Sequence, residues 1–238
     1  MLILFFGVTP VTAQTVKSPE EILAVFLGIP YRVDGCVDGQ GRYTLFTGYD
    51  KFFSTPGLNC SGFVLEASRI LLKRNIPLSV AINDRLGDSG PGAPLGQDWD
   101  FGWDMILNIS EGLERVLLLP GNVRADPAAG SGLAPLGFDL HAPETWRELP
   151  DRIRSNHLYL VSFSKTSGQR GSSSLKHYHV ALLIRISEKD WYIYNTTQKR
   201  GKVYRENLGS VQGRNRFLNA YANTGNARKH IFIIELPL

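Results

Sequence analysis

The sequence predicts an α+β fold, in which N-terminal helices pack on a mostly antiparallel sheet. Apolar residues recur at helical spacing near the start of the chain, at about residues 18–27 and 60–72. From residue 157 onward the chain falls into apolar segments with short turns between them, which is typical of strands. Helices followed by strands indicate an α+β layout rather than alternating βαβ units.

The composition is that of a water-soluble globular protein. The chain has 238 residues, of which 43% are hydrophobic, so it is long enough to bury a core. Its net charge is +4, and the basic residues are mostly scattered, so we expect no nucleic-acid partner. Beyond the N-terminus, no stretch approaches the ~18 apolar residues that span a membrane, so we expect no stable membrane insertion.

Residues 1–13 form a short apolar run that ends in a small-x-small pattern at Ala13. This pattern resembles the apolar region and cleavage site of a signal peptide, although the usual charged start is missing. The alternative is a buried N-terminal strand. With a signal peptide, the protein is exported to the periplasm or the extracellular space, and residues 14–238 form a single domain.

The first helix after this leader begins at Ser18, which is a good N-cap, with Pro19 at the first helical position and acidic residues in the first turn. The segment from Tyr31 to Gly48 is then predicted to form a loop or a short hairpin.

Cys60 lies at the start of the second helix pattern. A Pro-Gly turn and Asn59 precede it, and Ser61 and Gly62 follow it. A thiol at a helix N-terminus is stabilised as a thiolate by unpaired N–H groups and the helix dipole. Free cysteines are also often small buried residues without chemistry, so this position alone leaves both interpretations open.

Residues 77–143 differ in composition from the rest of the chain. They contain Gly/Pro-rich loops and several aromatic residues, and they predict a loop-rich insertion between the cysteine helix and the later strands. We expect the aromatic residues to attach this insertion to the core.

The C-terminal half supplies a base and an orienting group for the thiol. The segments that begin at His157, His179 and Trp191 predict strands, and a turn at residues 187–190 joins the last two into a hairpin. In this hairpin His179 and Asn195 fall near the same end. A thiol nucleophile needs a nearby base, and that base needs a third group that fixes its tautomer.

These residues resemble a known family. The string Asn59-Cys60-Ser61-Gly62-Phe63-Val64 is similar to the Asp-Cys-Ser-Gly-Phe-Val signature of the NlpC-type papain-like cysteine peptidases of bacterial cell walls. The strand beginning His179-Val180 resembles the histidine strand of that family, and Asn195 falls where the third polar residue stands. Tyr31 to Gly35 resembles the Tyr-x-x-Gly-Gly segment.

The resemblance implies a papain-like fold and hydrolysis of amide bonds in peptidoglycan stem peptides. It implies that Cys60 is the nucleophile, His179 the base and acid, and Asn195 the orienting group. Tyr31, Asn59 and Ser61 would contact the substrate, and no metal or cofactor is expected. Asn59 stands where family members carry an Asp that helps to hold the substrate's amino group, so recognition of an amine is in doubt.

Other interpretations remain open. His177 and His179, with His157 or Asp190, could bind zinc if alternate strand residues share one face. The same scaffold could serve as an acyltransferase or as a non-catalytic envelope-binding module. Cys36 and Cys60 could also form a disulfide in an oxidising compartment, and Cys60 would then have no free thiol to act as a nucleophile.

Overall fold

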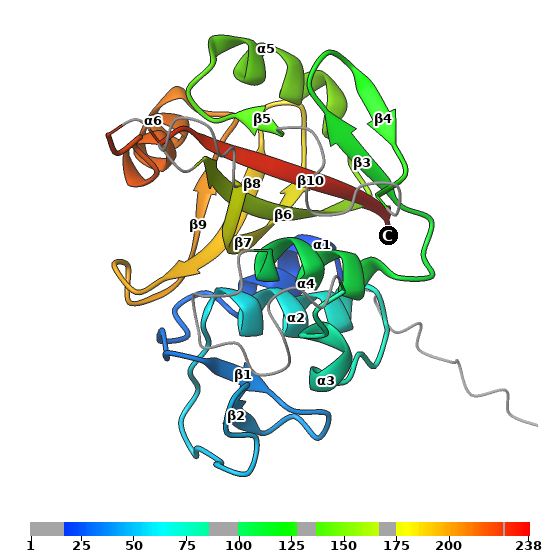
Figure 1. The fold of residues 1–238 in the computed structure, drawn as a ribbon, viewed down its shortest axis with the longest axis vertical. Helices are drawn as coiled ribbons and strands as arrows, with labels where there is room; N and C mark the ends of the chain where they lie inside the picture. The colour runs from blue at the N-terminus through cyan, green and yellow to red at the C-terminus, as the bar shows by residue number, and fades with distance from the viewer. Residues whose placement is uncertain (1–16, 86–99, 128–136, 167–174, 226) are drawn as a thin grey trace, which may run out of the picture.

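The computed structural model describes residues 17–85, 100–127, 137–166, 175–225 and 227–238. The segment 1–13, for which the sequence predicts a signal peptide, lies outside these residues. The described part is a mixed α+β fold, as the sequence predicts (Figure 1).

The centre of the fold is an eight-stranded sheet with the order β4-β3-β10-β6-β7-β8-β9, in which β5 also pairs with β10. Its strands are β3 (Val116–Leu119), β4 (Val123–Ala125), β5 (Phe138–Asp139), β6 (His157–Thr166), β7 (Leu175–Arg185), β8 (Trp191–Thr197), β9 (Lys202–Asn207) and β10 (Lys229–Pro237). Every pairing among these strands is antiparallel, which confirms the predicted sheet.

Helices cover both faces of this sheet (Figure 1). One face carries α1 (Pro19–Ala24), α2 (Cys60–Leu71) and α4 (Phe101–Ser110), and the other carries α5 (Pro143–Arg152) and α6 (Val211–Ala220). Alternate residues of β7 pack into the two layers. Val180 and Leu182 face the α2 side, whereas Ala181 and Leu183 face the α5 and α6 side.

A small hairpin lies beyond α2 from the main sheet (Figure 1). It consists of β1 (Gly35–Val37) and β2 (Tyr43–Leu45), which pair with each other in antiparallel fashion. The main sheet and this hairpin therefore enclose α2 from two sides, which holds the helix that carries Cys60.

The segment 77–143 is only partly the loop-rich insertion that the sequence predicts. Besides α3 (Leu78–Ala81) it contains α4 and the strands β3, β4 and β5, and β3 pairs with β10 inside the main sheet. Trp103 on α4 is 1% exposed and packs on Phe232 of β10, with ring centroids 5.4 Å apart. The described part of this segment thus belongs to the core. α4 was not predicted, because nearly all of its side chains are buried, its polar Asp104 and Asn108 included, and no solvent-exposed face marks the helix.

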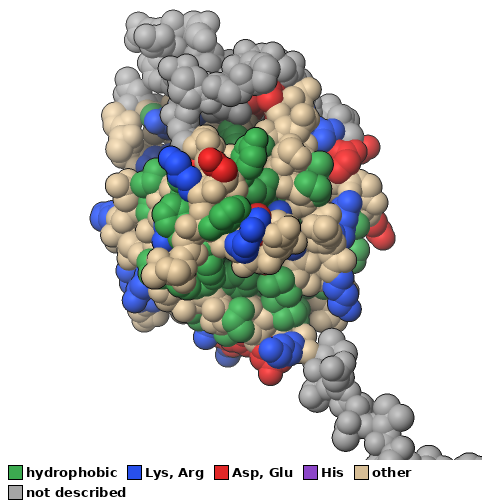
Figure 2. Space-filling model, turned by 90° about the horizontal axis from the view of Figure 1, so that it is seen from below, with side chains coloured by type: hydrophobic (Ala, Val, Ile, Leu, Met, Phe, Trp, Pro, Cys, Tyr) green, Lys and Arg blue, Asp and Glu red, His purple; other side chains and the backbone are tan. Residues whose placement is uncertain are grey.

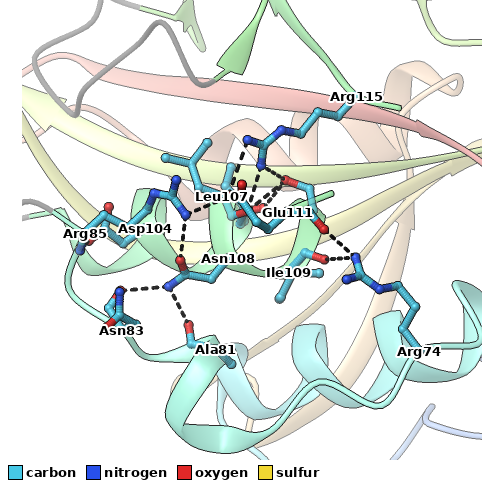
Figure 3. A network of polar contacts seen from close by, with 12 residues as sticks. Arg74, Ala81, Asn83, Arg85, Asp104, Leu107, Asn108, Ile109, Glu111 and Arg115 are labelled. Atoms are coloured by element: carbon cyan, nitrogen blue, oxygen red, sulfur yellow. Dashed lines mark hydrogen bonds and ion pairs between the residues drawn. The ribbon is translucent and has the colours of Figure 1, made fainter. Parts of the chain in front are cut away.

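Arginine side chains donate hydrogen bonds at the C-terminal end of α4 (Figure 3). The last carbonyl groups of a helix lack the backbone N–H donors that a further turn would supply. Arg115 donates to the carbonyl oxygen of Leu107 at 2.9 Å, and Arg74 donates to that of Glu111 at 2.7 Å. Asn108 donates to the carbonyl oxygen of Asn83 at 2.7 Å, which ties α4 to the chain after α3.

The surface around the hairpin combines apolar and basic side chains. On the face drawn in Figure 2, apolar side chains gather near the centre, and the Lys and Arg side chains are spread around them rather than collected in one patch. None of the helices in the described ranges has the length and apolar character needed to cross a membrane.

Candidate active site

Cys60 is the first residue of α2, as the sequence predicts. Asn59 is the N-cap, and its Oδ1 accepts a hydrogen bond from the backbone N–H of Gly62 at 2.7 Å. The backbone N–H of Phe63 donates to the carbonyl oxygen of Asn59 at 3.0 Å. By helix geometry, the N–H groups of Cys60 and Ser61 have no acceptor in a preceding turn, so this end of α2 carries partial positive charge.

Two glycines let the hairpin and α2 approach each other. A β-carbon placed on Gly62 would lie 2.0 Å from the carbonyl oxygen of Gly35 in β1, so the position excludes any side chain. The same carbonyl oxygen accepts a hydrogen bond from the backbone N–H of Asn59 at 2.9 Å. β1 therefore fixes the residue before Cys60 directly.

A β-bulge in β7 sets the direction of His179. In the pairing with β6, Phe163 faces His179 and Ser164 faces His177, which leaves Tyr178 as the extra residue. This corrects the expectation that His179 begins its strand, because β7 already starts at Leu175 and His179 lies inside it.

The bulge also separates the two histidines of the predicted zinc pair. His177 lies against Trp103 and Phe232 in the α4 layer, with ring centroids 5.8 Å and 5.0 Å away. His179 lies against Phe163 on the other face, at 5.1 Å. The expectation that alternate strand residues share a face is wrong here, because one extra residue stands between the two pairs. Within the described ranges, His157 forms no possible metal group with either histidine, and its Nδ1 lies 2.8 Å from the carbonyl oxygen of Ser155.

His179 connects Cys60 to Asn195. Nε2 of His179 lies 2.7 Å from Oδ1 of Asn195, whose side chain is fully buried. The side chain of His179 also forms a hydrogen bond with the half-buried thiol of Cys60. Because Asn195 occupies Nε2, Nδ1 is the ring nitrogen left to face the sulfur. The structure thus brings together the three residues that the sequence singled out.

Burial and the neighbouring charge shift the pKa of the Cys60 thiol in opposite directions. Burial raises the pKa of the thiol, whereas the charge and hydrogen bond of His179 lower it, together with the backbone N–H of Val180 and the hydroxyl of Ser61. The result is a pKa of about 7. Burial likewise lowers the pKa of His179, but the Cys60 thiolate and Asn195 outweigh it and raise that pKa above its ordinary value. The pair therefore favours thiolate and imidazolium.

The three other predicted residues lie around the thiol in different roles. Ser61 is buried and its hydroxyl lies 3.9 Å from the Cys60 sulfur. Burial raises the pKa of Tyr31, and the negative charge of Cys60 raises it further, so the two groups are electrostatic neighbours. Asn59 is buried and uses its side-chain oxygen to cap α2. A substrate contact of Asn59 stays a prediction.

The sequence analysis missed Tyr221, which binds the far side of Asn195. Nδ2 of Asn195 donates to the Tyr221 hydroxyl at 2.7 Å. Tyr221 is the C-cap of α6 and stacks on Phe163 with ring centroids 4.5 Å apart. No local motif marks this tyrosine, because it reaches the site only through the packing of α6 on the sheet.

The disulfide that Cys36 and Cys60 could form is absent from the structure. Cys36 and Cys60 are both free, and Cys36 is fully buried in β1. Burial, reinforced by the charge of Asp34, raises the pKa of Cys36 to about 12. The pKa values of the two thiols therefore differ by several pH units, and Cys60 is the one that ionises more readily.

One group of side chains within the described ranges could hold a metal ion. The carboxylates of Asp84, Asp100 and Asp104 each have an oxygen within 4.8 Å of the others. Asp104 also accepts a hydrogen bond from the backbone N–H of Arg85 at 2.6 Å. These residues belong to α4 and the chain that leads to it, and none is among the predicted site residues.

Comparison with known proteins assigns no family. No family model matches the chain, and no curated protein matches it significantly. The chain is similar to the crystal structure of protein LPG0564 from Legionella pneumophila, described under the family DUF1460, with 14% sequence identity and a TM-score of 0.47 over 92% of this chain and 88% of that one. A likeness of this degree assigns neither a family nor a function.

Proposed function

We propose that this protein is a papain-like cysteine amidase of the NlpC type, which hydrolyses amide bonds in peptidoglycan stem peptides. One observation carries the proposal: Cys60, at the start of a helix, is hydrogen-bonded to His179, and His179 is held at 2.7 Å by the buried Asn195. A helix-borne thiol, a strand-borne imidazole and an amide in this order constitute a nucleophile, a base and an orienting group.

The arrangement of the layers supports the papain-like assignment. α2 packs with its N-terminus beside β7 and β8, and these are neighbouring antiparallel strands of the main sheet. The choice of substrate rests on the resemblance of residues 59–64 and 179–183 to the cell-wall enzymes. A peptidoglycan substrate would place the protein in the periplasm or outside the cell.

In the acylation step, the Cys60 thiolate attacks the carbonyl carbon of the scissile amide. The negative charge that develops on the carbonyl oxygen would be stabilised by the backbone N–H of Cys60 and by the hydroxyl of Tyr31. His179, as imidazolium, donates its proton to the amide nitrogen, the C–N bond breaks, and the amine leaves. The enzyme is then a thioester on Cys60 with a neutral His179.

In the deacylation step, His179 acts as a base. It removes a proton from a water molecule, whose oxygen attacks the thioester carbon and displaces the Cys60 sulfur. The carboxylic acid leaves, and His179 and Cys60 return to the imidazolium–thiolate pair. Asn195 accepts the hydrogen bond from Nε2 throughout, which keeps Nδ1 directed at the reacting atoms.

Digestion of purified peptidoglycan tests the proposal. Wild type, Cys60→Ala and Cys36→Ala would be incubated with the polymer, and new amino groups would be counted and identified by mass spectrometry. The two variants carry the same substitution at the two cysteines, one reactive and one buried. We expect new amines with wild type and Cys36→Ala and none with Cys60→Ala. Amines that form equally with Cys60→Ala, or in no sample, would refute the proposal, and transfer products would indicate an acyltransferase.

A further inference from the structure

We propose that Tyr221 is a positioning residue, which fixes the side-chain amide of Asn195 so that its oxygen, rather than its nitrogen, faces His179. The inference concerns the state of the Cys60–His179 pair and goes beyond the proposed reaction. It rests on a chain of side-chain contacts that runs from Cys60 through His179 and Asn195 to Tyr221.

The amide of Asn195 must be held in one orientation. Its two ends are nearly equal in size, but only the oxygen accepts the N–H of an imidazolium, whereas the NH₂ group would oppose it. Both ends are engaged: Oδ1 lies 2.7 Å from Nε2 of His179, and Nδ2 lies 2.7 Å from the hydroxyl of Tyr221. Asn195 is 0% exposed, so no solvent competes for either end.

A hydroxyl can donate or accept, so the direction of its own proton decides which end of the amide it selects. In the contact with Asn195 the donor is Nδ2, so the Tyr221 oxygen accepts and its own proton points elsewhere. Tyr204 of β9 is a neighbouring hydroxyl that interacts with Tyr221. A Tyr221 proton directed to Tyr204 leaves the oxygen lone pairs for Nδ2 of Asn195.

The ring of Tyr221 is held in place by its packing, so its hydroxyl has a fixed position relative to Asn195. It is 6% exposed, stacks on Phe163 at 4.5 Å and contacts Phe217 of α6 at 5.1 Å. Phe163 is also the residue that faces His179 across the bulge. One aromatic side chain thus sets the positions of both the imidazole and the hydroxyl that controls its partner.

The test measures the ionisation of Cys60 and needs no substrate. The rate of alkylation by iodoacetamide would be followed from pH 5 to pH 10, with Cys36→Ala as the background so that Cys60 reacts alone. The titratable groups that act on this sulfur are His179, Tyr31 and Tyr221. We expect Tyr221→Phe to raise the midpoint by about one pH unit, which slows alkylation at pH 6 by about tenfold.

Tyr159→Phe is the matched control. Tyr159 is equally a buried tyrosine of the α5 and α6 layer, and its hydroxyl accepts from the backbone N–H of Arg154 at 2.6 Å. This variant loses a buried hydroxyl without touching Asn195, so it is expected to lower the unfolding temperature and leave the midpoint unchanged.

Tyr204→Phe is a second, milder variant, because it removes the hydroxyl that interacts with Tyr221 and leaves the Tyr221 ring in place. It is expected to raise the midpoint in the same direction as Tyr221→Phe. Wild-type midpoints in both variants would overturn the inference, as would an equal rise in Tyr159→Phe. If peptidoglycan is not cleaved, the proposed function fails while this midpoint test still decides the role of Tyr221.

Discussion

The backbone of Gly62 touches the carbonyl oxygen of Gly35 so closely that a β-carbon on Gly62 would lie 2.0 Å from it. This contact joins the first turn of α2 to β1, and it therefore determines where the Cys60 sulfur lies relative to the sheet.

Gly62→Ala is expected to destabilise the protein, because the new methyl group must push β1 away from α2. Overpacking of this kind costs about 1–3 kcal/mol in the free energy of unfolding. Gly39→Ala is the control, since no atom lies within 4 Å of a β-carbon placed there. Urea unfolding of the two variants checks the prediction, and equal stability of both would contradict it.

His179→Ala is expected to raise the pKa of Cys60. In the wild type, His179 holds the thiol pKa at about 7 against the effect of burial, and the ordinary value is 9.0. Without the imidazole, burial remains, so the midpoint of alkylation is expected at pH 9 or above. A midpoint still near pH 7 would show that the helix N-terminus alone accounts for the lowered pKa.

Asn59→Asp is expected to raise the pKa of Cys60 without loss of the helix cap. An aspartate oxygen can accept the same hydrogen bond from Gly62, but it places a negative charge next to the thiolate, which disfavours ionisation of Cys60 by about one pH unit. Asn59→Ser, a neutral cap, is the control. The prediction fails if both variants show the same alkylation midpoint.

Glu235→Gln is expected to lower stability at neutral pH more than in acid. Burial raises the pKa of Glu235, but hydrogen bonds from Arg124 and Arg154 outweigh it, so the pKa lies below the ordinary value of a glutamate. A lowered pKa in the folded state contributes stability above the unfolded pKa, and this stability is lost as the pH falls through the folded pKa.

We therefore expect Glu235→Gln to cost about 1–3 kcal/mol at pH 7, because Arg124 and Arg154 lose the buried negative charge with which both are paired. The difference from wild type should shrink toward pH 3. Glu144→Gln, at an exposed carboxylate, is the control. Urea unfolding at both pH values provides the measurement, and a difference that stays constant with pH would count against the account.

The sequence alone was sufficient to predict the positions of residues whose surroundings come from nearby parts of the chain. The position of Cys60 at the start of a helix follows from the apolar pattern after it, and the approach of His179 to Asn195 follows from a hairpin with a short turn. The 2.7 Å contact between those two side chains agrees with that expectation. α1 also begins at the predicted cap, with Ser18 and Glu21 bonded reciprocally.

The features that the sequence analysis missed depend on pairing between distant segments. The bulge at Tyr178 exists only relative to β6, so the strand pattern of residues 175–185 does not reveal it. Tyr221 stands 26 residues after Asn195 and meets it only because α6 packs on the sheet. α4 is buried on nearly all sides, and its polar residues Asp104 and Asn108 bond to other segments instead of facing solvent, so no exposed face marks the helix in the sequence.

The most direct test of the central claim is to follow hydrolysis of peptidoglycan while Cys60 is alkylated in steps. The alkylated fraction of Cys60 would be measured by peptide mass spectrometry, and amine release would be measured on the same samples. The account predicts that the rate falls in proportion to the unmodified Cys60 and reaches zero when none remains. Full amine release from protein whose Cys60 is completely alkylated would contradict it.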